Sequence, residues 1–316
     1  MSGCFVDRFA YALGSRKLAV EETAAAGRTR TGAAELLEAG FRFHHVCDDG
    51  ETAYDLAEAA VRSLGDAVEG AGAIVYATCI PANANVADPA RFAASGDVKD
   101  LMDYPASRLQ AALGLDDAVV LGLNQQACTS MLGSVRLASA LLATEPGMER
   151  VLCVSADRFP PGASYEQAYS LISDGAGACV VSRRPPGYRM VAAHHITNGA
   201  MVAADDDETV GAYFSYTHRL VTELLAKAGL APGDLAWVVP QNTNVKAWQI
   251  LARLLRVDHE RVWCPSMPDV AHVISADNMV NMAYLEASGR VQPGDKVLLA
   301  MAGYGMNWQG LVLEKA

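Results

Sequence analysis

The chain has 316 residues, of which 51% are hydrophobic and 19% charged, and its formal net charge is −11. These values are ordinary for a globular protein with a large core, and the negative balance disfavours nucleic acid and membranes as partners. Seven scattered cysteines without metal-ligand spacing predict reduced thiols, with neither zinc nor disulfides. The N-terminus lacks the basic-then-apolar order of a signal peptide, and no uninterrupted apolar run reaches the roughly 18 residues of a membrane span, so we expect a cytoplasmic protein.

Strands and helices alternate along the first part of the chain, which is typical of an α/β fold. Apolar residues recur every three or four positions from Thr52 to Leu64 and predict a helix. The run 73–77 then predicts a buried strand. Residues 81–105 are rich in proline and alanine and carry several charges, so they predict an excursion over the surface.

Cys128 lies where a strand gives way to a helix. The apolar run 118–123 predicts a buried strand, and the helix formers of 132–142 predict a helix. Unpaired N–H groups and the dipole at a helix N-terminus favour negative charge, and the thiolate is the reactive form of cysteine. A free cysteine is also often just a small buried hydrophobic residue. Spacing alone leaves both interpretations open.

The second part of the chain repeats this alternation in outline. Strands are expected at 150–155, 178–182, 188–194, 235–239, 296–300 and 310–313, and helices at 218–228, 242–255 and 273–287. Four consecutive acidic residues, 205–208, predict a solvated and mobile stretch. The order of elements is compatible with two similar halves.

Four segments in order resemble motifs of the ketosynthase III branch of the thiolase superfamily. The setting of Cys128 resembles its nucleophile region, and residues 171–178 (LISDGAGA) resemble its "GDGAGA" turn. Residues 239–244 (VPQNTN) resemble its "PHQAN" segment, and residues 301–308 (MAGYGMNW) resemble its "GGGFTWG" loop. Residues 290–294 also match the turn before its last strands.

This resemblance implies a thiolase fold, in which two similar βαβαβ-type halves form αβαβα layers. The halves would be residues 1–183, with the nucleophile, and residues 184–316, with the other site residues. It also implies a homodimer joined near the strand before Cys128, and an acyl-CoA or acyl-carrier-protein thioester as substrate without a permanently bound cofactor. In this fold an excursion such as 81–105 often contacts the partner and roofs the substrate tunnel, although a plain surface loop is equally compatible with the sequence.

The chain departs from the family where the family has its "PHQAN" histidine, because Gln241 occupies that position. Glutamine donates hydrogen bonds but does not titrate near neutrality, which argues against decarboxylative condensation. Downstream, His272 lies in the segment that, by resemblance, faces the nucleophile. Asp277 follows five residues later and would fix the tautomer of His272 and raise its basicity. The alternative is a hydrogen-bonded structural histidine and a helix-capping aspartate.

Charge stabilisation completes the expected site. Attack on a thioester creates an oxyanion, for which the N–H of Cys128 and a backbone N–H of the Gly303–Gly305 loop are candidate donors. Asn244 and Asn278 are candidates for polar support beside Gln241. The cofactor-binding residues are not identified by the sequence.

Three functions remain open. The first is an acyltransferase: Cys128 takes an acyl group, and His272 with Asp277 deprotonates a small-molecule hydroxyl or amine, or a carrier acceptor, in a biosynthetic pathway such as those of secondary metabolites. The second is a condensing enzyme that forms a carbon–carbon bond. The third is a non-catalytic partner subunit, which the histidine missing at 241 favours and the retained Cys128 disfavours.

Overall fold

The computed structural model describes residues 3–84, 89–304 and 306–316. Its core is a mixed sheet in the order β11-β12-β13-β10-β1-β9-β6-β4-β5. The strands of the first half are β1 (Phe5–Leu13), β4 (Ala73–Ala77), β5 (Val119–Leu123), β6 (Arg150–Asp157) and β9 (Gly175–Ser182). Those of the second half are β10 (Tyr188–Thr197), β11 (Trp237–Val239), β12 (Lys296–Gly303) and β13 (Asn307–Lys315).

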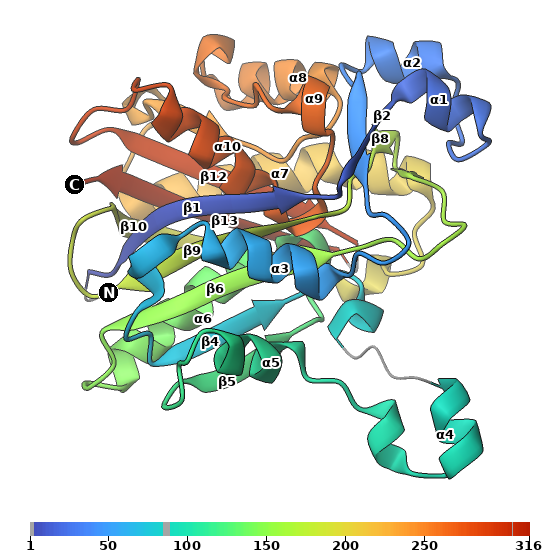
Figure 1. Ribbon diagram of the computed structural model, residues 1–316. Coiled ribbons are helices and arrows are strands. Elements are labelled where there is room, and N and C mark those ends of the chain that lie inside the picture. The colour runs from blue at the N-terminus through green and yellow to red at the C-terminus, as the bar shows by residue number, and fades with distance from the viewer. Residues whose placement is uncertain (1–2, 85–88, 305) are drawn as a thin grey trace.

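The two halves of this sheet and the helices around and between them form five layers (Figure 1). The outer face of the first half is covered by α3 (Ala53–Arg62) and α5 (Pro105–Ala112), and that of the second half by α7 (Asp206–Ala228) and α8 (Val245–Leu255). Between the halves lie α6 (Ser130–Thr144) and α10 (Asp277–Ala287), whose apolar residues share one core with strands of both halves. The αβαβα arrangement expected from the resemblance is therefore confirmed.

The two halves meet where β1 pairs with β10, at Phe5–Arg189 and Val6–Tyr188. The chain passes from one half to the other in the turn between β9 and β10. The division at 183/184 stays a prediction, because α10 of the second half packs against β1 and β9 of the first. Smaller elements complete the fold: α1 (Val20–Ala25), α2 (Ala33–Glu38), α4 (Pro89–Ser95), α9 (Met267–Val270), β2 (Arg16–Ala19), β3 (Phe43–Val46), β7 (Glu166–Gln167) and β8 (Ser170–Leu171).

The parallel strands β4, β5 and β6 bring three distant segments to one edge of the sheet. Beyond their carboxyl ends come Cys79, Cys128 and, as the last residue of β6, Asp157. Ligands of open α/β sheets bind at this kind of edge. The topology thus collects chemically active side chains that are far apart in the sequence.

The strand before Cys128 is less buried than its apolar sequence predicts. β5 is an edge strand, and Val119 is 55% exposed in the single chain. An edge strand presents unpaired N–H and C=O groups together with one uncovered side. The expectation of a buried strand is therefore wrong for the isolated chain.

The acidic stretch 205–208 is not a mobile loop but the start of α7. The Asp205 carboxylate accepts a hydrogen bond from the Glu208 N–H at 2.8 Å, and the Glu208 carboxylate accepts from the Asp205 N–H at 3.4 Å. This reciprocal pair is a capping box, and negative charge is favourable at a helix N-terminus. The Asp-x-x-Glu spacing of Asp205 and Glu208 predicts this cap, but a run of like charges does not reveal it.

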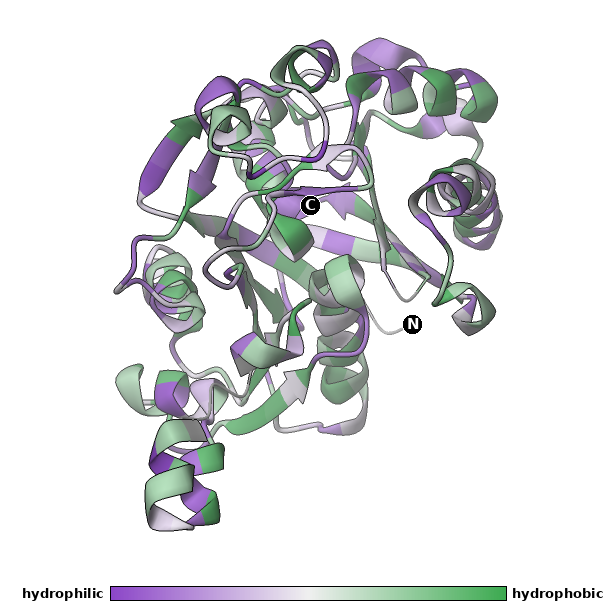
Figure 2. Ribbon diagram, turned by 90° about the vertical axis from the view of Figure 1, so that its right-hand side faces the viewer, coloured by the Kyte–Doolittle hydropathy of each residue, from purple (hydrophilic) through white to green (hydrophobic). Residues whose placement is uncertain are grey.

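The excursion projects from the body as a helical arm (Figures 1 and 2). It contains α4 and a short 3₁₀ turn at Val98–Leu101. Val98, Met102 and Tyr104 are 54%, 47% and 60% exposed. Large apolar side chains therefore lie on the surface of this arm.

One window, 127–144, has the length and composition of a membrane span, although polar residues interrupt its apolar run. It comprises the Cys128 turn and α6. Since 56% of it is buried inside the fold and α6 lies in the central layer, it is the core helix of this fold.

Candidate active site

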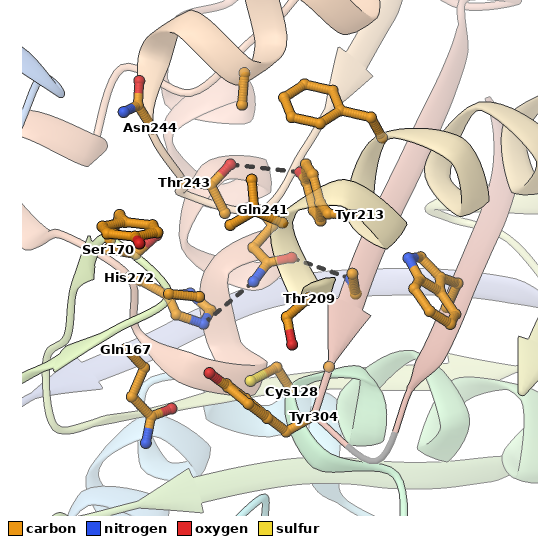
Figure 3. A pocket seen from close by; sticks show the side chains of 18 of the residues that line it. Cys128, Gln167, Ser170, Thr209, Tyr213, Gln241, Thr243, Asn244, His272 and Tyr304 are labelled. Carbon is orange, nitrogen blue, oxygen red and sulfur yellow. Dashed lines mark hydrogen bonds between the residues drawn. The ribbon is translucent and has the colours of Figure 1, made fainter. Parts of the chain in front are cut away.

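Cys128 lies in a short 3₁₀ turn, Ala127–Thr129, which leads directly into α6. Its residue is 6% exposed, and its sulfur faces a cavity (Figure 3). The preceding Ala127 has φ = 46°, a left-handed conformation that is unfavourable for a residue with a β-carbon. Ala271, directly before His272, has φ = 52°. Backbone strain of this kind concentrates at functional sites, where the surrounding structure holds it in place.

His272 and Asp277 form a buried pair. His272 Nδ1 lies 2.5 Å from Asp277 Oδ2, and the two side chains are 5% and 0% exposed. The same carboxylate accepts from two backbone N–H groups, those of Asn242 at 2.7 Å and Val273 at 2.6 Å. Because these donors fix both oxygens, the carboxylate holds the imidazole ring in one orientation.

Gln241 contacts the other nitrogen of His272. The backbone N–H of Ala302 donates to Gln241 Oε1 at 3.0 Å, so the amide nitrogen turns towards His272 Nε2, 3.3 Å away (Figure 3). An amide nitrogen only donates hydrogen bonds. This contact is therefore a hydrogen bond only when Nε2 is unprotonated, with the ring proton on Nδ1 facing Asp277. That tautomer places the basic lone pair of His272 towards the cavity.

The electrostatics favour a thiolate at Cys128. Its pKa is lowered to about 5, mainly by a hydrogen bond from Cys79 and also by His272, against the opposing effect of burial. Burial lowers the pKa of His272, but the charge and hydrogen bond of Asp277, together with Cys128, outweigh it and raise that pKa above its usual value. The free site thus favours a thiolate–imidazolium pair. Acylation removes the thiolate charge and with it one cause of the raised pKa of His272.

The glycine loop lies directly on the nucleophile. A β-carbon at Gly303 would lie 2.8 Å from the backbone nitrogen of Cys128. Only glycine leaves this N–H open, as an oxyanion donor requires. Gly305, the other glycine expected here, lies outside the described residues. The oxyanion role of both stays a prediction.

The two candidate asparagines form hydrogen bonds outside the set of Cys128, His272 and Gln241. Asn244 lines the outer cavity wall, and its side chain accepts from the Lys246 N–H at 2.9 Å as the N-cap of α8. Asn278 donates to the carbonyl oxygen of Val239 at 2.9 Å and is not part of the cavity lining among the described residues. Neither is hydrogen-bonded to Gln241 or His272 through a contact seen here, so their supporting roles stay predictions with no geometric support.

The structure adds residues that sequence reasoning missed. Cys79 Sγ lies 3.8 Å from Cys128 Sγ, and Asp157 accepts hydrogen bonds from the Cys79 segment. Asn242 donates to the carbonyl oxygen of Ala271 at 2.9 Å and so braces the strained turn before His272. The one signal in the sequence for a role of Cys79 was its place just after a predicted strand. Nothing in the spacing indicated its contact with Cys128.

The cavity above Cys128 has a volume of about 280 Å³. Its inner wall contains Cys128, His272 and Gln241, while α7 and α8 contribute apolar side chains such as Phe214 and Ile250. Ligand pockets typically occupy about 300–1,000 Å³, so this cavity is at the small end. Among the described residues, no cluster of three His, Cys, Asp or Glu side chains is arranged to hold a metal ion.

Comparison with known proteins links this geometry to a family. Residues 124–199 match the family model described as 3-oxoacyl-[acyl-carrier-protein] synthase III, and residues 225–315 match its C-terminal counterpart. The β-ketoacyl-[acyl-carrier-protein] synthase III of Rhodospirillum centenum is 29% identical over 302 residues, covering 85% of this chain and 86% of that protein. The enzyme of the same name from Rhizorhabdus wittichii is 26% identical over 294 residues, with the same coverage of 85% and 86%.

Solved structures share the fold over nearly the whole chain. The β-ketoacyl-[acyl-carrier-protein] synthase III of Thermus thermophilus superposes with a TM-score of 0.82 at 21% identity, covering 99% of both chains. ChlB3, described as an acyltransferase, superposes with a TM-score of 0.81 at 20% identity, covering 99% of this chain and 98% of its own. At these identities the superpositions establish the fold alone.

Proposed function

Because the chain belongs to the ketosynthase III-like branch of the thiolase superfamily, a family of acyl-transferring enzymes, we propose that it is an acyltransferase acting through a Cys128 thioester. The acyl donor is an acyl-CoA or an acyl-carrier-protein thioester. The acceptor is a small-molecule hydroxyl or amine, or a carrier, in a biosynthetic pathway such as one of secondary metabolism. One observation carries this proposal: His272 is fixed by Asp277 at Nδ1 and faces Gln241 at Nε2.

The first half-reaction uses the thiolate–imidazolium pair. The Cys128 thiolate attacks the thioester carbonyl, and the Cys128 N–H stabilises the oxyanion beside Gly303. As the tetrahedral intermediate collapses, the bond to the donor sulfur breaks, and the leaving thiolate takes the Nε2 proton of His272. The products are an acyl-Cys128, a free donor thiol and a neutral His272.

The second half-reaction uses that neutral histidine as the base. His272 Nε2 takes the proton of the acceptor while the acceptor oxygen or nitrogen attacks the acyl-Cys128 carbonyl. Collapse expels the Cys128 thiolate beside the new imidazolium, which restores the resting pair. In the acyl-enzyme the Gln241 N–H stabilises the unprotonated Nε2 of His272, and this hydrogen bond breaks as Nε2 takes the acceptor proton. Cys128 and His272 therefore return to their starting state after each turnover without a second histidine.

The small cavity bears on the substrate. A space of about 280 Å³ suits a short acyl group together with the end of a pantetheine arm better than a long fatty chain. The wall residues Thr209, Tyr213 and Thr243 add hydroxyl groups near that space. We propose a short-chain acyl donor on this ground.

A condensing enzyme is the second candidate, since the curated relatives named above are β-ketoacyl-[acyl-carrier-protein] synthases III. That reaction needs donors that stabilise an enolate, whereas His272 Nε2 accepts a hydrogen bond from Gln241 in this contact and is not itself a donor there. The intact Cys128, His272 and Asp277 arrangement also disfavours a non-catalytic partner subunit. Both remain as outcomes of the experiment.

The experiment is an acyl-CoA panel followed by intact-mass measurement. We expect a mass increase equal to one short acyl group, located on Cys128, that disappears when an acceptor amine or alcohol is added. Carbon dioxide release from malonyl-CoA with a new carbon–carbon bond would instead establish the condensing reaction. An unchanged mass with every donor would favour the partner subunit.

The assembly and location belong to the same proposal. The exposed edge of β5 and the apolar side chains of the excursion arm, at Val98, Met102 and Tyr104, are surfaces that a second subunit would cover. We propose a homodimer in the cytoplasm, with acyl carrier protein as a donor or acceptor partner.

A further inference from the structure

A second thiol lies beside the nucleophile. Cys79 Sγ is 3.8 Å from Cys128 Sγ, a separation within hydrogen-bonding reach for two sulfur atoms. Cys79 follows β4 by two residues, and Cys128 follows the neighbouring strand β5. The two thiols are 49 residues apart in sequence. They meet only because β4 and β5 are parallel and end at the same edge of the sheet.

The backbone around Cys79 is held by the buried carboxylate of Asp157, which is 1% exposed. The Cys79 N–H donates to its two oxygens at 2.9 and 3.0 Å, and the Ile80 N–H donates to Oδ1 at 2.9 Å. The Thr78 hydroxyl also donates to Oδ1, at 2.5 Å, and the Ser275 hydroxyl donates to Oδ2 at 3.3 Å. With the chain fixed on both sides, the sulfur of Cys79 has only its side-chain torsion free.

The surrounding charges decide which sulfur keeps the proton. Burial raises the pKa of Asp157 to about 6, which still leaves a carboxylate at neutral pH beside Cys79. A neighbouring negative charge disfavours a thiolate, and the pKa of Cys79 is raised by its hydrogen bond with Cys128, by burial and by the charges of Cys128 and Asp157. Cys128 instead has the imidazole of His272 and the start of α6 beside it. The proton therefore stays on Cys79, and Cys79 is the donor.

We propose that Cys79 is a positioning residue for the nucleophile: its S–H donates to Cys128 Sγ and holds that sulfur as a thiolate aimed into the cavity. Its link to acyl transfer rests on the function proposed above, but the contact itself does not. A hydrogen bond to a charged group contributes about 1.5–3 kcal/mol, which corresponds to a shift of about one to two pH units in the ionisation of Cys128.

The same contact has an oxidative consequence. A peroxide would oxidise the Cys128 thiolate to a sulfenic acid and release hydroxide. The neighbouring Cys79 thiol would then attack that sulfur and form a Cys79–Cys128 disulfide, with loss of one water. The attacking thiol of Cys79 is already in contact with Cys128, so the disulfide should form before the sulfinic acid.

The test is the pH dependence of Cys128 alkylation by iodoacetamide, followed by peptide mass spectrometry in the absence of any acyl donor. We expect Cys79→Ala to move the midpoint upwards by about one to two pH units, and Cys79→Ser, which keeps a donor, to restore most of the shift. Cys264→Ala is the matched control, since Cys264 is also a half-buried free thiol, and it should leave the midpoint unchanged. A wild-type midpoint in Cys79→Ala would overturn the proposal.

A second measurement uses the wild-type protein and so does not depend on whether a variant folds. Treatment with hydrogen peroxide should yield a peptide pair joined between Cys79 and Cys128 that dithiothreitol releases, with recovery of alkylation at Cys128. Conversion of Cys128 to a sulfinic acid without that disulfide would contradict the contact. Since neither measurement uses an acyl donor, failure of acyl transfer would overturn the proposed function and leave this inference standing.

Discussion

Gln241 and His272 meet nitrogen to nitrogen, with 3.3 Å between Gln241 Nε2 and His272 Nε2. The amide has no freedom to reverse, because the Ala302 N–H already donates to its oxygen at 3.0 Å. Gln241 therefore acts as a donor towards unprotonated His272, and it favours the form of the ring that accepts a proton once acylation has removed the charge of Cys128. A histidine at 241, as in the family motif, would carry a titratable ring instead of this fixed donor.

Exchanging that donor for an acceptor should disable the base. In Gln241→Glu the carboxylate still accepts from the Ala302 N–H but now also accepts from a protonated His272 Nε2, which raises the pKa of His272 in the acyl-enzyme. The base works only when unprotonated, so the rising limb of the transfer rate should move to higher pH, with a loss of at least about tenfold at pH 7. The measurement is acyl-enzyme decay against pH in single-turnover experiments.

The matched control for that variant is Gln167→Glu. Gln167 lines the same cavity, and its amide is directed away from His272 (Figure 3). The variant adds the same charge without touching the ring, so it should keep the wild-type pH profile. Equal shifts in both variants would show that net charge in the cavity, and not the contact with His272, sets the profile.

Removing the base should separate the two half-reactions. We expect His272→Ala to slow decay of acyl-Cys128 by about 10²–10⁴-fold, the usual contribution of a positioned general base. His272→Gln should do no better, because it restores shape but not basicity. Acyl-enzyme formation should fall less, since α6 and Cys79 still favour the thiolate. Wild-type decay in His272→Ala would make His272 a structural residue.

Asp277 should affect both activity and stability. Asp277→Asn turns one of two accepting oxygens into an NH₂ donor, so the side chain can no longer accept from His272 and from both backbone N–H groups. We expect transfer to fall by at least about 10²-fold and unfolding to become easier by roughly 1–3 kcal/mol, as when a buried hydrogen-bonded carboxylate is lost. Kinetics and urea unfolding measure the two effects. Asp269→Asn, which removes an exposed partner of Lys17, is the control and should change neither.

The nucleophile should be distinguishable by its reactivity. With its pKa lowered to about 5, Cys128 is already a thiolate at pH 6, whereas an ordinary thiol ionises near 8.5. Its alkylation rate should therefore be nearly flat from pH 6 to 8, and Cys128 should be the fastest of the seven thiols to react. Faster alkylation of another cysteine, or a covalent acyl-enzyme in Cys128→Ala, would remove Cys128 from this role.

Assembly is tested by sedimentation. A homodimer of 33.4 kDa chains should sediment at twice the chain mass over a wide range of concentration. The physical reason is the uncovered edge of β5 together with the apolar side chains of the excursion arm. A monomer mass at every concentration would contradict the dimer and would leave the arm as a plain surface excursion.

The sequence was sufficient to predict an α/β fold and the place of Cys128 between a strand and a helix, and its resemblance to a family supplied the layers. These features depend on local patterns: apolar runs for parallel strands, helical spacing of apolar residues, and ordered motifs. The pairing of His272 with Asp277 could also be predicted, because the two residues are only five positions apart. The capping box that starts α7 was equally local, but the charge count obscured it.

Tertiary structure alone decided the contacts between distant segments. The Cys79–Cys128 contact depends on two parallel strands ending together, and the orientation of Gln241 depends on one backbone N–H of β12, 61 residues away. It also placed Asn244 as a helix cap and Asn278 against β11. Hydrogen bonds act over about 3 Å, and no spacing in one sequence specifies which distant groups the packing of the layers brings within that distance.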